Sequence, residues 1–263
     1  MSLRFLLRCV VAILLAFGVA PAAAQAEAQS SPAPAALPFG PGEQALFQVR
    51  LGGVSVGRGS MQVLGVEKVD GFDTFHTRMV IAGGIPLARV DDRFDSWIDV
   101  AGLFSRRFDQ DQKEIRFRRK RRYDFFPERR VFVRENGETG TLPTSEPLDD
   151  VSFLYFTRTL PLRVGESYTL NRYFKEEGNP VVIQVLRRER ITVPAGTFNT
   201  IVVRPIIRTR GLFGEGGQAE VFFSDDERRI PVQIRSRVPV VGSLSLHLQE
   251  YRPGTTVRGA ARP

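Results

Sequence analysis

Apolar residues recur at every second position over most of this chain, and this spacing constrains the fold more than any other feature. In SLSLHLQ, residues 243–249, the three leucines point to one side of an extended chain and the polar residues to the other. In RIPVQIRSRV, residues 229–238, isoleucine and valine alternate with arginine and glutamine in the same way. A period of two is typical of antiparallel strands with one buried face and one solvated face. The sequence therefore predicts an all-β protein.

Similar alternation predicts most of the other strands. Turn residues separate them: VPAGTF contains a hairpin turn in which Gly196 supplies the backbone of positive φ, and ENGE contains a turn of the Asn-Gly kind. Besides TIVVRPIIRT at 200–209 and the two segments above, the predicted strands are 44–51, 55–66, 74–81, 88–99, 113–125, 130–135, 167–174, 181–193 and 218–224.

One segment, EPLDDVSFLYFTRT, is typical of a helix. Pro147 suits the first turn, and Asp149 and Asp150 oppose the helix dipole there. Leu148, Val151, Leu154 and Tyr155 fall on one helical face. We therefore expect a large curved antiparallel sheet, or an incomplete β-barrel, with one short helix that covers an open end.

The N-terminus is typical of a secretory signal peptide. Arg4 and Arg8 precede an apolar run over Val10–Val19, and small residues with an A-x-A pattern follow, ending at Ala24. The run is far shorter than the roughly 20 apolar residues that cross a bilayer, and no later segment is apolar enough to do so. We expect export to the periplasm or cell envelope, with no transmembrane segment after signal removal. The one cysteine, Cys9, lies within the signal.

Composition divides the chain into four parts. A stretch rich in Pro and Ala, QSSPAPAALPFGPG, indicates an extended tether, and no second stretch of this composition interrupts the alternating region. The expected organisation is a signal peptide at 1–24, a tether at 25–42, a single β-rich domain at 43–253 and a flexible tail at 254–263.

The sequence offers few candidates for catalysis. His76 and His247 both fall on polar strand faces, where either could act as a general base, although two solvated histidines are the simpler interpretation. We find no G-x-S-x-G nucleophile motif and no H-E-x-x-H zinc motif, so we expect no metal and no cofactor. The acidic pairs 91–92, 149–150 and 225–226 suit a strand, a helix start and a hairpin turn better than a carboxylate pair for hydrolysis.

The most distinctive charged segment is KEIRFRRKRRYDF, residues 113–125. Read as one strand, it places Ile115, Phe117 and Tyr123 on one face, while the other face is basic. Four like charges at every second position repel, and the nearby Glu128 and Glu135 are too few to balance them, so an external polyanion could neutralise this face. The candidate binding residues are Arg116, Arg118, Lys120 and Arg122.

Four segments resemble the domain of unknown function 3108 family. They are LPFGPGEQALFQVRLGGVSVGRGSMQV, EPLDDVSFLYFTRTLPLRVGE, ITVPAGTFNTIVVRP and FFSDDERRIPVQIRSRVPVVGSLSLHL, which occur in this order between Leu37 and Tyr251. The resemblance implies an exported bacterial protein with a β-rich fold, and it brings no established activity or catalytic residues. The basic run from Arg116 to Arg122 belongs to none of these segments.

Several functions remain open at this stage. The first is a noncatalytic binding or structural module for an anionic or amphiphilic envelope component, such as an anionic lipid, a polysaccharide or an envelope protein. It is favoured by the basic strand and by a net charge of +8, which becomes +6 when Arg4 and Arg8 leave with the signal. The alternative is a hydrolase with a dispersed site near His247 or His76. Nucleic-acid binding through basic and aromatic strands is argued against by export.

Overall fold

The alternating segments form one antiparallel sheet. The computed structural model describes residues 36–85, 88–114, 117–207, 219–238 and 242–257, which lie in a unit that spans Pro34–Pro263. The strands of the described residues are β1 (Gln44–Leu51), β2 (Val54–Val69), β3 (Phe72–Ile85), β4 (Ala88–Asp99), β5 (Ser105–Glu114), β6 (Phe117–Phe126), β7 (Val131–Arg134), β8 (Thr139–Thr141), β9 (Ser167–Leu170), β10 (Val181–Val193), β11 (Gly196–Ile206), β12 (Glu220–Ser224), β13 (Pro231–Val238) and β14 (Gly242–Arg252).

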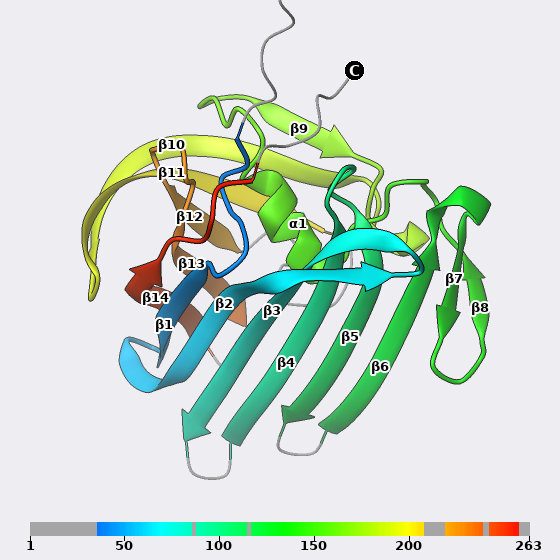
Figure 1. Ribbon diagram of the computed structural model, residues 1–263. Coiled ribbons are helices and arrows are strands. Elements are labelled where there is room, and N and C mark those ends of the chain that lie inside the picture. Colours follow the sequence, from blue (N-terminus) through cyan, green and yellow to red (C-terminus); the bar gives the residue numbers. More distant parts are fainter. Residues whose placement is uncertain (1–35, 86–87, 115–116, 208–218, 239–241, 258–263) are drawn as a thin grey trace, which may run out of the picture. The chain divides into compact units, whose positions relative to one another are not determined.

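The sheet follows the order of the chain almost completely (Figure 1). Its order runs from β8 back to β1, then from β14 back to β9, so the first and last strands pair and every other neighbour is consecutive in sequence. The two edges are β8 and β9. The chain passes from one edge to the other through the helix α1 (Asp150–Thr157). The fold is therefore an all-β meander that stays open at one seam, with the helix in the connection across it.

Most strands occur where the alternation predicts them. Strands β1, β4 and β10 have the predicted bounds, and most of the others differ by a few residues at their ends. The prediction of a single strand over 113–125 is wrong, because β5 ends at Glu114 and β6 begins at Phe117. The sequence reading also missed most of β5 and the short β8, and predicted β9 too long.

The helix is buried on every side. All residues from Val151 to Thr157 are buried, which explains why apolar side chains occur around the whole helix and not on one stripe. The helix begins later than predicted, because Pro147 and Leu148 precede it and do not lie in its first turn. Asp149 is the cap and accepts hydrogen bonds from the backbone N–H groups of Val151 and Ser152. None of the helices in the described part of the chain has the length and hydropathy that a membrane span needs.

Serine side chains attach the start of α1 to the sheet. Ser96 on β4 and Ser105 on β5 donate to the second carboxylate oxygen of Asp149, at 2.6 and 2.7 Å. Burial raises the pKa of Asp149 to about 6, although these hydrogen bonds oppose the shift. Asp149 therefore connects the start of α1 to β4 and β5, and the helix packs against β3 and β4 (Figure 1).

A buried ion pair attaches the other end of the helix. Arg158 is fully buried and its guanidinium donates to both carboxylate oxygens of Glu43, at 2.6 and 2.9 Å. The same guanidinium donates to the carbonyl oxygens of Pro38 and Arg228. Arg158 thereby joins the helix to the start of β1 and to the turn between β12 and β13, a role that the sequence reading missed.

Candidate functional site

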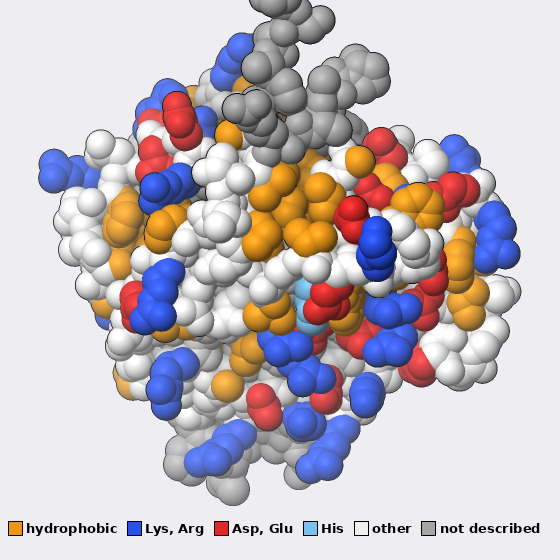
Figure 2. All heavy atoms as spheres, in the orientation of Figure 1, with side chains coloured by type: hydrophobic (Ala, Val, Ile, Leu, Met, Phe, Trp, Pro, Cys, Tyr) orange, Lys and Arg blue, Asp and Glu red, His pale blue; other side chains and the backbone are white. Residues whose placement is uncertain are grey.

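The outer face of strands β3 to β6 is covered with charged side chains. Directly opposed residues on neighbouring strands point to the same face, so the strand register gives the arrangement of side chains. Lys and Arg are interspersed with Asp and Glu over this part of the surface (Figure 2). From the end that contacts α1, the four rows are His76–Trp97–Arg107–Asp124, Arg78–Asp95–Asp109–Arg122, Val80–Arg93–Asp111–Lys120 and Ala82–Asp91–Lys113–Arg118.

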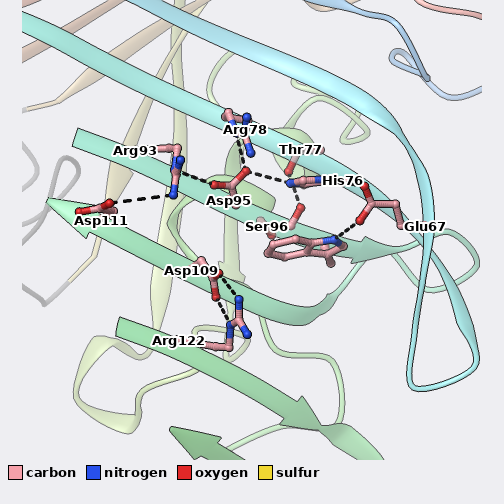
Figure 3. Close-up of polar contacts among 11 residues, drawn as sticks. Glu67, His76, Thr77, Arg78, Arg93, Asp95, Ser96, Asp109, Asp111 and Arg122 are labelled. Carbon is pink, nitrogen blue, oxygen red and sulfur yellow. Dashed lines mark hydrogen bonds and ion pairs between the residues drawn. The ribbon is translucent and has the colours of Figure 1, made fainter. Parts of the chain in front are cut away.

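His76 lies between two carboxylates (Figure 3). Its Nε2 lies 2.8 Å from Asp95 Oδ1, its Nδ1 lies 2.9 Å from Glu67 Oε1, and its ring stacks on Trp97 at a centroid distance of 4.3 Å. Two acceptors suit the protonated imidazolium, in which both ring nitrogens donate. The prediction that His76 is solvated is wrong, because the residue is only 8% exposed.

Asp95 is the centre of this cluster. Its buried carboxylate accepts hydrogen bonds from His76 and from Arg78 Nε at 2.6 Å, and Arg93 Nε lies 3.2 Å from its second oxygen (Figure 3). Glu67, which reaches over from β2, also accepts a hydrogen bond from Trp97 Nε1 at 2.9 Å. Every polar atom of the His76 ring is therefore engaged by neighbouring side chains.

The pKa shifts agree with this geometry. Burial lowers the pKa of His76, but the hydrogen bonds to Asp95 and Glu67 outweigh burial and leave the pKa above its ordinary value. Burial raises the pKa of Asp95, and its hydrogen bonds with His76 and Arg78 outweigh that effect and lower it. A histidine whose two ring nitrogens both contact carboxylates has no free position from which to remove a proton from a substrate. The cluster therefore favours a structural role over general-base catalysis.

Strand β5 changes the interpretation of the basic segment. The sequence predicts that the charges of 116–122 lack partners, but β5 pairs with β6 and brings carboxylates to the same face. Arg122 donates from Nε and from a terminal nitrogen to the two carboxylate oxygens of Asp109, both at 2.8 Å (Figure 3). This hydrogen bonding raises the pKa of the Arg122 guanidinium. The expectation of an unbalanced row is therefore wrong at Arg122.

Arg118 and Lys120 differ from Arg122. Both side chains are exposed, and within the described residues neither forms an ion pair. Arg118 lies opposite Lys113, a like charge, and Lys120 lies opposite Asp111, which is itself close to Lys113 at 3.8 Å and to Arg93 at 3.9 Å. In the two rows nearest the end of the β5–β6 hairpin, four cations thus face two carboxylates. Arg116 and Ile115 lie outside the described residues.

The aromatic residues of β6 do not lie with the exposed cations. Tyr123 and Phe125 are buried in the core and contact Phe174 at ring-centroid distances of 5.1 and 5.4 Å. The charged face of β6 therefore has no base-stacking platform from these two residues.

His247 lies elsewhere in the sheet, on β14. It is half-buried, and its Nε2 lies 2.9 Å from Ser245 Oγ. Burial, followed by the charges of Arg50 and Arg235, lowers the pKa of His247 to about 4. His76 and His247 therefore belong to separate environments and do not form one catalytic site.

The acidic pairs occupy the structural positions that the sequence suggests. Asp91 is exposed while Asp92 is buried, as expected for neighbours in a strand. Asp225 and Asp226 lie in the turn between β12 and β13, where Asp225 pairs with Arg229 at 3.2 Å. Among the described residues no group of three or more His, Cys, Asp or Glu side chains is arranged to hold a metal ion.

The carboxylates of β5 had a weak sequence signal. The strand SRRFDQDQKE contains one apolar residue, Phe108, so it lacks the alternation of apolar and polar residues that reveals a strand. The available signal was the alternation of Asp109 and Asp111 with glutamine, two residues apart and directly before the basic run. Opposite charges on both sides of a short turn favour a hairpin with cross-strand ion pairs.

Comparisons with known proteins support the fold. A family model described as "Protein of unknown function (DUF3108)" matches residues 46–249. A Brucella abortus structure described as a beta-barrel-like protein of domain of unknown function DUF1849 is 10% identical, with a TM-score of 0.53, and the match covers 82% of this chain and 99% of that chain. At this identity the likeness extends to the fold alone.

Two other solved structures match less well. A presumed exported protein with a YmcC-like fold from Bacteroides fragilis is 12% identical with a TM-score of 0.30, over 84% of this chain and 99% of that chain. A presumed lipoprotein from Parabacteroides distasonis is 11% identical with a TM-score of 0.30, over 82% and 99% of the two chains. No curated protein matches the sequence significantly.

Proposed function

The chain belongs to the DUF3108 family of proteins of unknown function, and from this premise we propose that it is a noncatalytic module that binds an anionic or amphiphilic component of the cell envelope. The observation that carries the proposal is the exposed pair Arg118 and Lys120 beside Lys113, at the end of the β5–β6 hairpin. These cations outnumber the carboxylates around them. An anionic surface would supply the missing counter-charge, and each such cation contributes roughly 1 kcal/mol near an anionic bilayer.

The location of the hairpin end supports this proposal. Arg122, which is farther from the hairpin end along β6, is already neutralised by Asp109. The excess positive charge is therefore confined to the two cross-strand rows that contain Lys120 and Arg118. A ligand that approaches the hairpin end would meet these cations before the balanced rows near His76. The expected signal peptide would bring the domain to a compartment where anionic lipids and polysaccharides are abundant.

The hydrolase alternative has weaker support. His76 has both nitrogens engaged, and the pKa of His247 is lowered to about 4, which makes a poor base near neutral pH. Ser245 lies close to His247, but within the described residues no carboxylate is recorded in contact with the His247 ring to orient it. A Ser-His pair without this third group lacks one element of an activated nucleophile.

The proposal is tested by cosedimentation of the exported form of the protein with lipid vesicles. We expect binding to vesicles that contain phosphatidylglycerol, weak binding to phosphatidylcholine vesicles, and a loss of affinity as salt increases. The Arg118→Ser/Lys120→Ser variant should bind about tenfold more weakly or worse, because two surface cations are removed.

A matched control separates the site from net charge. The Arg188→Ser/Arg252→Ser variant removes the same charge from two exposed arginines that already pair, with Asp225 and with Glu250. This control should retain most of the affinity. Equal losses in the two double variants, or no loss in the first, would contradict a binding site at the hairpin end.

A further inference from the structure

A second, different group of cations lies on the outer face where β13, β14 and β1 meet. The register places Arg50 and Arg235 on either side of Ser245, and in the next row Gln48 and Gln233 on either side of His247. Directly opposed residues have Cβ atoms about 5 Å apart, so the two arginines can approach one another across the central strand. Each of these six side chains carries a hydrogen-bond donor.

Neither arginine has a counter-charge among the residues that the structure describes. Within the described residues Arg50 forms no ion pair, and its Nε donates to Gln48 Oε1 at 2.8 Å. Arg235 also forms no ion pair there; its guanidinium lies 4.4 Å from the centroid of the Phe222 ring, and its Nε is buried without a hydrogen-bond partner. An unsatisfied buried donor on a cation is costly, so this guanidinium has hydrogen-bonding capacity that its described neighbours do not use.

The nearest carboxylate is already occupied. Glu220 lies opposite Arg235 in the register, but its two oxygens accept hydrogen bonds from Arg187 and Arg204, at distances of 3.0 to 3.3 Å. Burial raises the pKa of Glu220, and these hydrogen bonds outweigh burial and lower it. One carboxylate that serves two other arginines leaves Arg235 free for an external acceptor.

We propose that Arg50, Arg235, Ser245 and His247 form a binding site for a single tetrahedral oxyanion, either free phosphate or sulfate or the same group on a larger ligand. The arginines supply charge from two sides, and the Ser245 hydroxyl donates between them while His247 Nε2–H donates to Ser245 Oγ. Ser245 is 7% exposed and His247 is half-buried, which strengthens charged hydrogen bonds relative to open water.

This site differs from the hairpin end in chemistry and in position. The hairpin cations are exposed and suit an extended anionic surface, whereas the partly buried donors around Ser245 suit one anionic group. The two proposals can fail separately, because phosphate binding is measured in the absence of vesicles and the Arg118→Ser/Lys120→Ser variant should bind phosphate normally.

The test is titration of the full exported protein with inorganic phosphate at neutral pH, followed by calorimetry and by the histidine ring signals in NMR spectra. The chain contains only two histidines, so the His247 signal is identified by its absence in the His247→Gln variant. Saturable phosphate binding should shift the His247 signal and leave the His76 signal in place. Arg50→Gln and Arg235→Gln should each weaken binding roughly tenfold.

Two further variants keep the result interpretable. Arg235→Lys retains the charge and should recover part of the affinity, which a folding defect would not allow. Arg252→Gln removes an exposed, paired arginine from the same strand as His247 and should bind phosphate like the original protein. A shift that sodium chloride of equal ionic strength reproduces, unchanged binding in Arg235→Gln, or no saturable binding would overturn the proposal. Sulfate and a phosphorylated sugar, tested in parallel, distinguish a free ion from a group on a larger ligand.

Discussion

The two histidines occupy equivalent positions in the sheet and have opposite electrostatic environments. His76 and His247 each lie on an outward strand face with neighbouring strands on both sides. The residues diagonal to His76 are Glu67 and Asp95, whose hydrogen bonds favour its protonation. The residues diagonal to His247 are Arg50 and Arg235, which disfavour its protonation.

Burial lowers the pKa of both histidines, and the cross-strand neighbours then reverse this shift at His76 and add to it at His247. Diagonal neighbours lie about 7 to 8 Å apart, within reach of long side chains. Around His76 the cations and carboxylates satisfy one another, so that region needs no ligand. Around His247 the described residues provide no carboxylate that pairs with Arg50 or Arg235. We therefore place the oxyanion site there.

The largest effect is expected when the central carboxylate near His76 is removed. Asp95→Asn should destabilise the protein by about 3 kcal/mol, because a buried histidine and Arg78 lose a charged partner. It should also lower the pKa of His76, since burial then acts with less opposition. Denaturant unfolding and NMR titration measure the two effects.

The control for this variant lies on the same strand. Asp91→Asn makes the same chemical change at an exposed residue that forms no recorded ion pair within the described chain, and it should alter stability by less than about 0.5 kcal/mol. A similar loss at the two positions would mean that general charge, and not the His76 cluster, determines stability here.

The sequence predicts which side chains point outward better than it predicts which charges pair. Local alternation correctly places His76, His247 and the row Arg118, Lys120 and Arg122 on outward faces, because strand geometry depends only on neighbours in sequence. Pairing is nonlocal. The partner of Arg122 is Asp109, on a strand with one apolar residue, and no pattern within either segment determines that register.

The helix shows the complementary case. The two aspartates near its start are local signals that predict a helix here, although Pro147 lies before the helix and Asp149 is its cap. Its burial on all sides, and the contact of Arg158 with Glu43 more than a hundred residues away in sequence, depend on the assembled sheet. The sequence therefore predicts the helix but not its contacts with the sheet.

The second prediction is that the contributions of His76 and His247 to stability depend on pH in opposite directions. Since the pKa of His76 is raised above 6.5 in the folded state, its stabilising contribution is complete below pH 6.5 and is lost as the pH rises through the folded value. The pKa of His247 is lowered to about 4, so the unfolded chain binds a proton between pH 6.5 and about 4 that the folded protein does not. The contribution of His247 is therefore lost as the pH falls through that interval.

The measurement is the free energy of unfolding against pH in His76→Gln and in His247→Gln, each compared with the original protein. The comparison removes the contribution of Asp149, whose pKa of about 6 affects the same pH range. NMR titration should place the two histidine midpoints on opposite sides of 6.5. If both midpoints lay on the same side of 6.5, the two histidines would not have opposite electrostatic environments.

The third prediction converts one environment towards the other. Gln233→Glu places a carboxylate directly opposite His247 and close to Arg235. It should raise the pKa of His247 by roughly 1 unit or more and should abolish phosphate binding, because the new carboxylate occupies the arginine. Gln62→Glu, the same change opposite Arg78 on β2, should leave the His247 midpoint in place. If Gln233→Glu left both properties unchanged, Arg235 would not belong to the site.

The smallest effect is expected at the exposed pair of Arg122 and Asp109, whose geometry is as good as that of the buried cluster. The side chain of Arg122 is 49% exposed and that of Asp109 is 25% exposed, so water competes for both groups. A double-mutant cycle with Arg122→Ala and Asp109→Ala should give a coupling energy below about 1 kcal/mol, and salt should reduce it further. The coupling between His76 and Asp95 should be larger and less sensitive to salt, because burial limits screening. Equal couplings at the two sites would show that hydrogen-bond geometry, rather than burial, controls how much these charges stabilise the sheet.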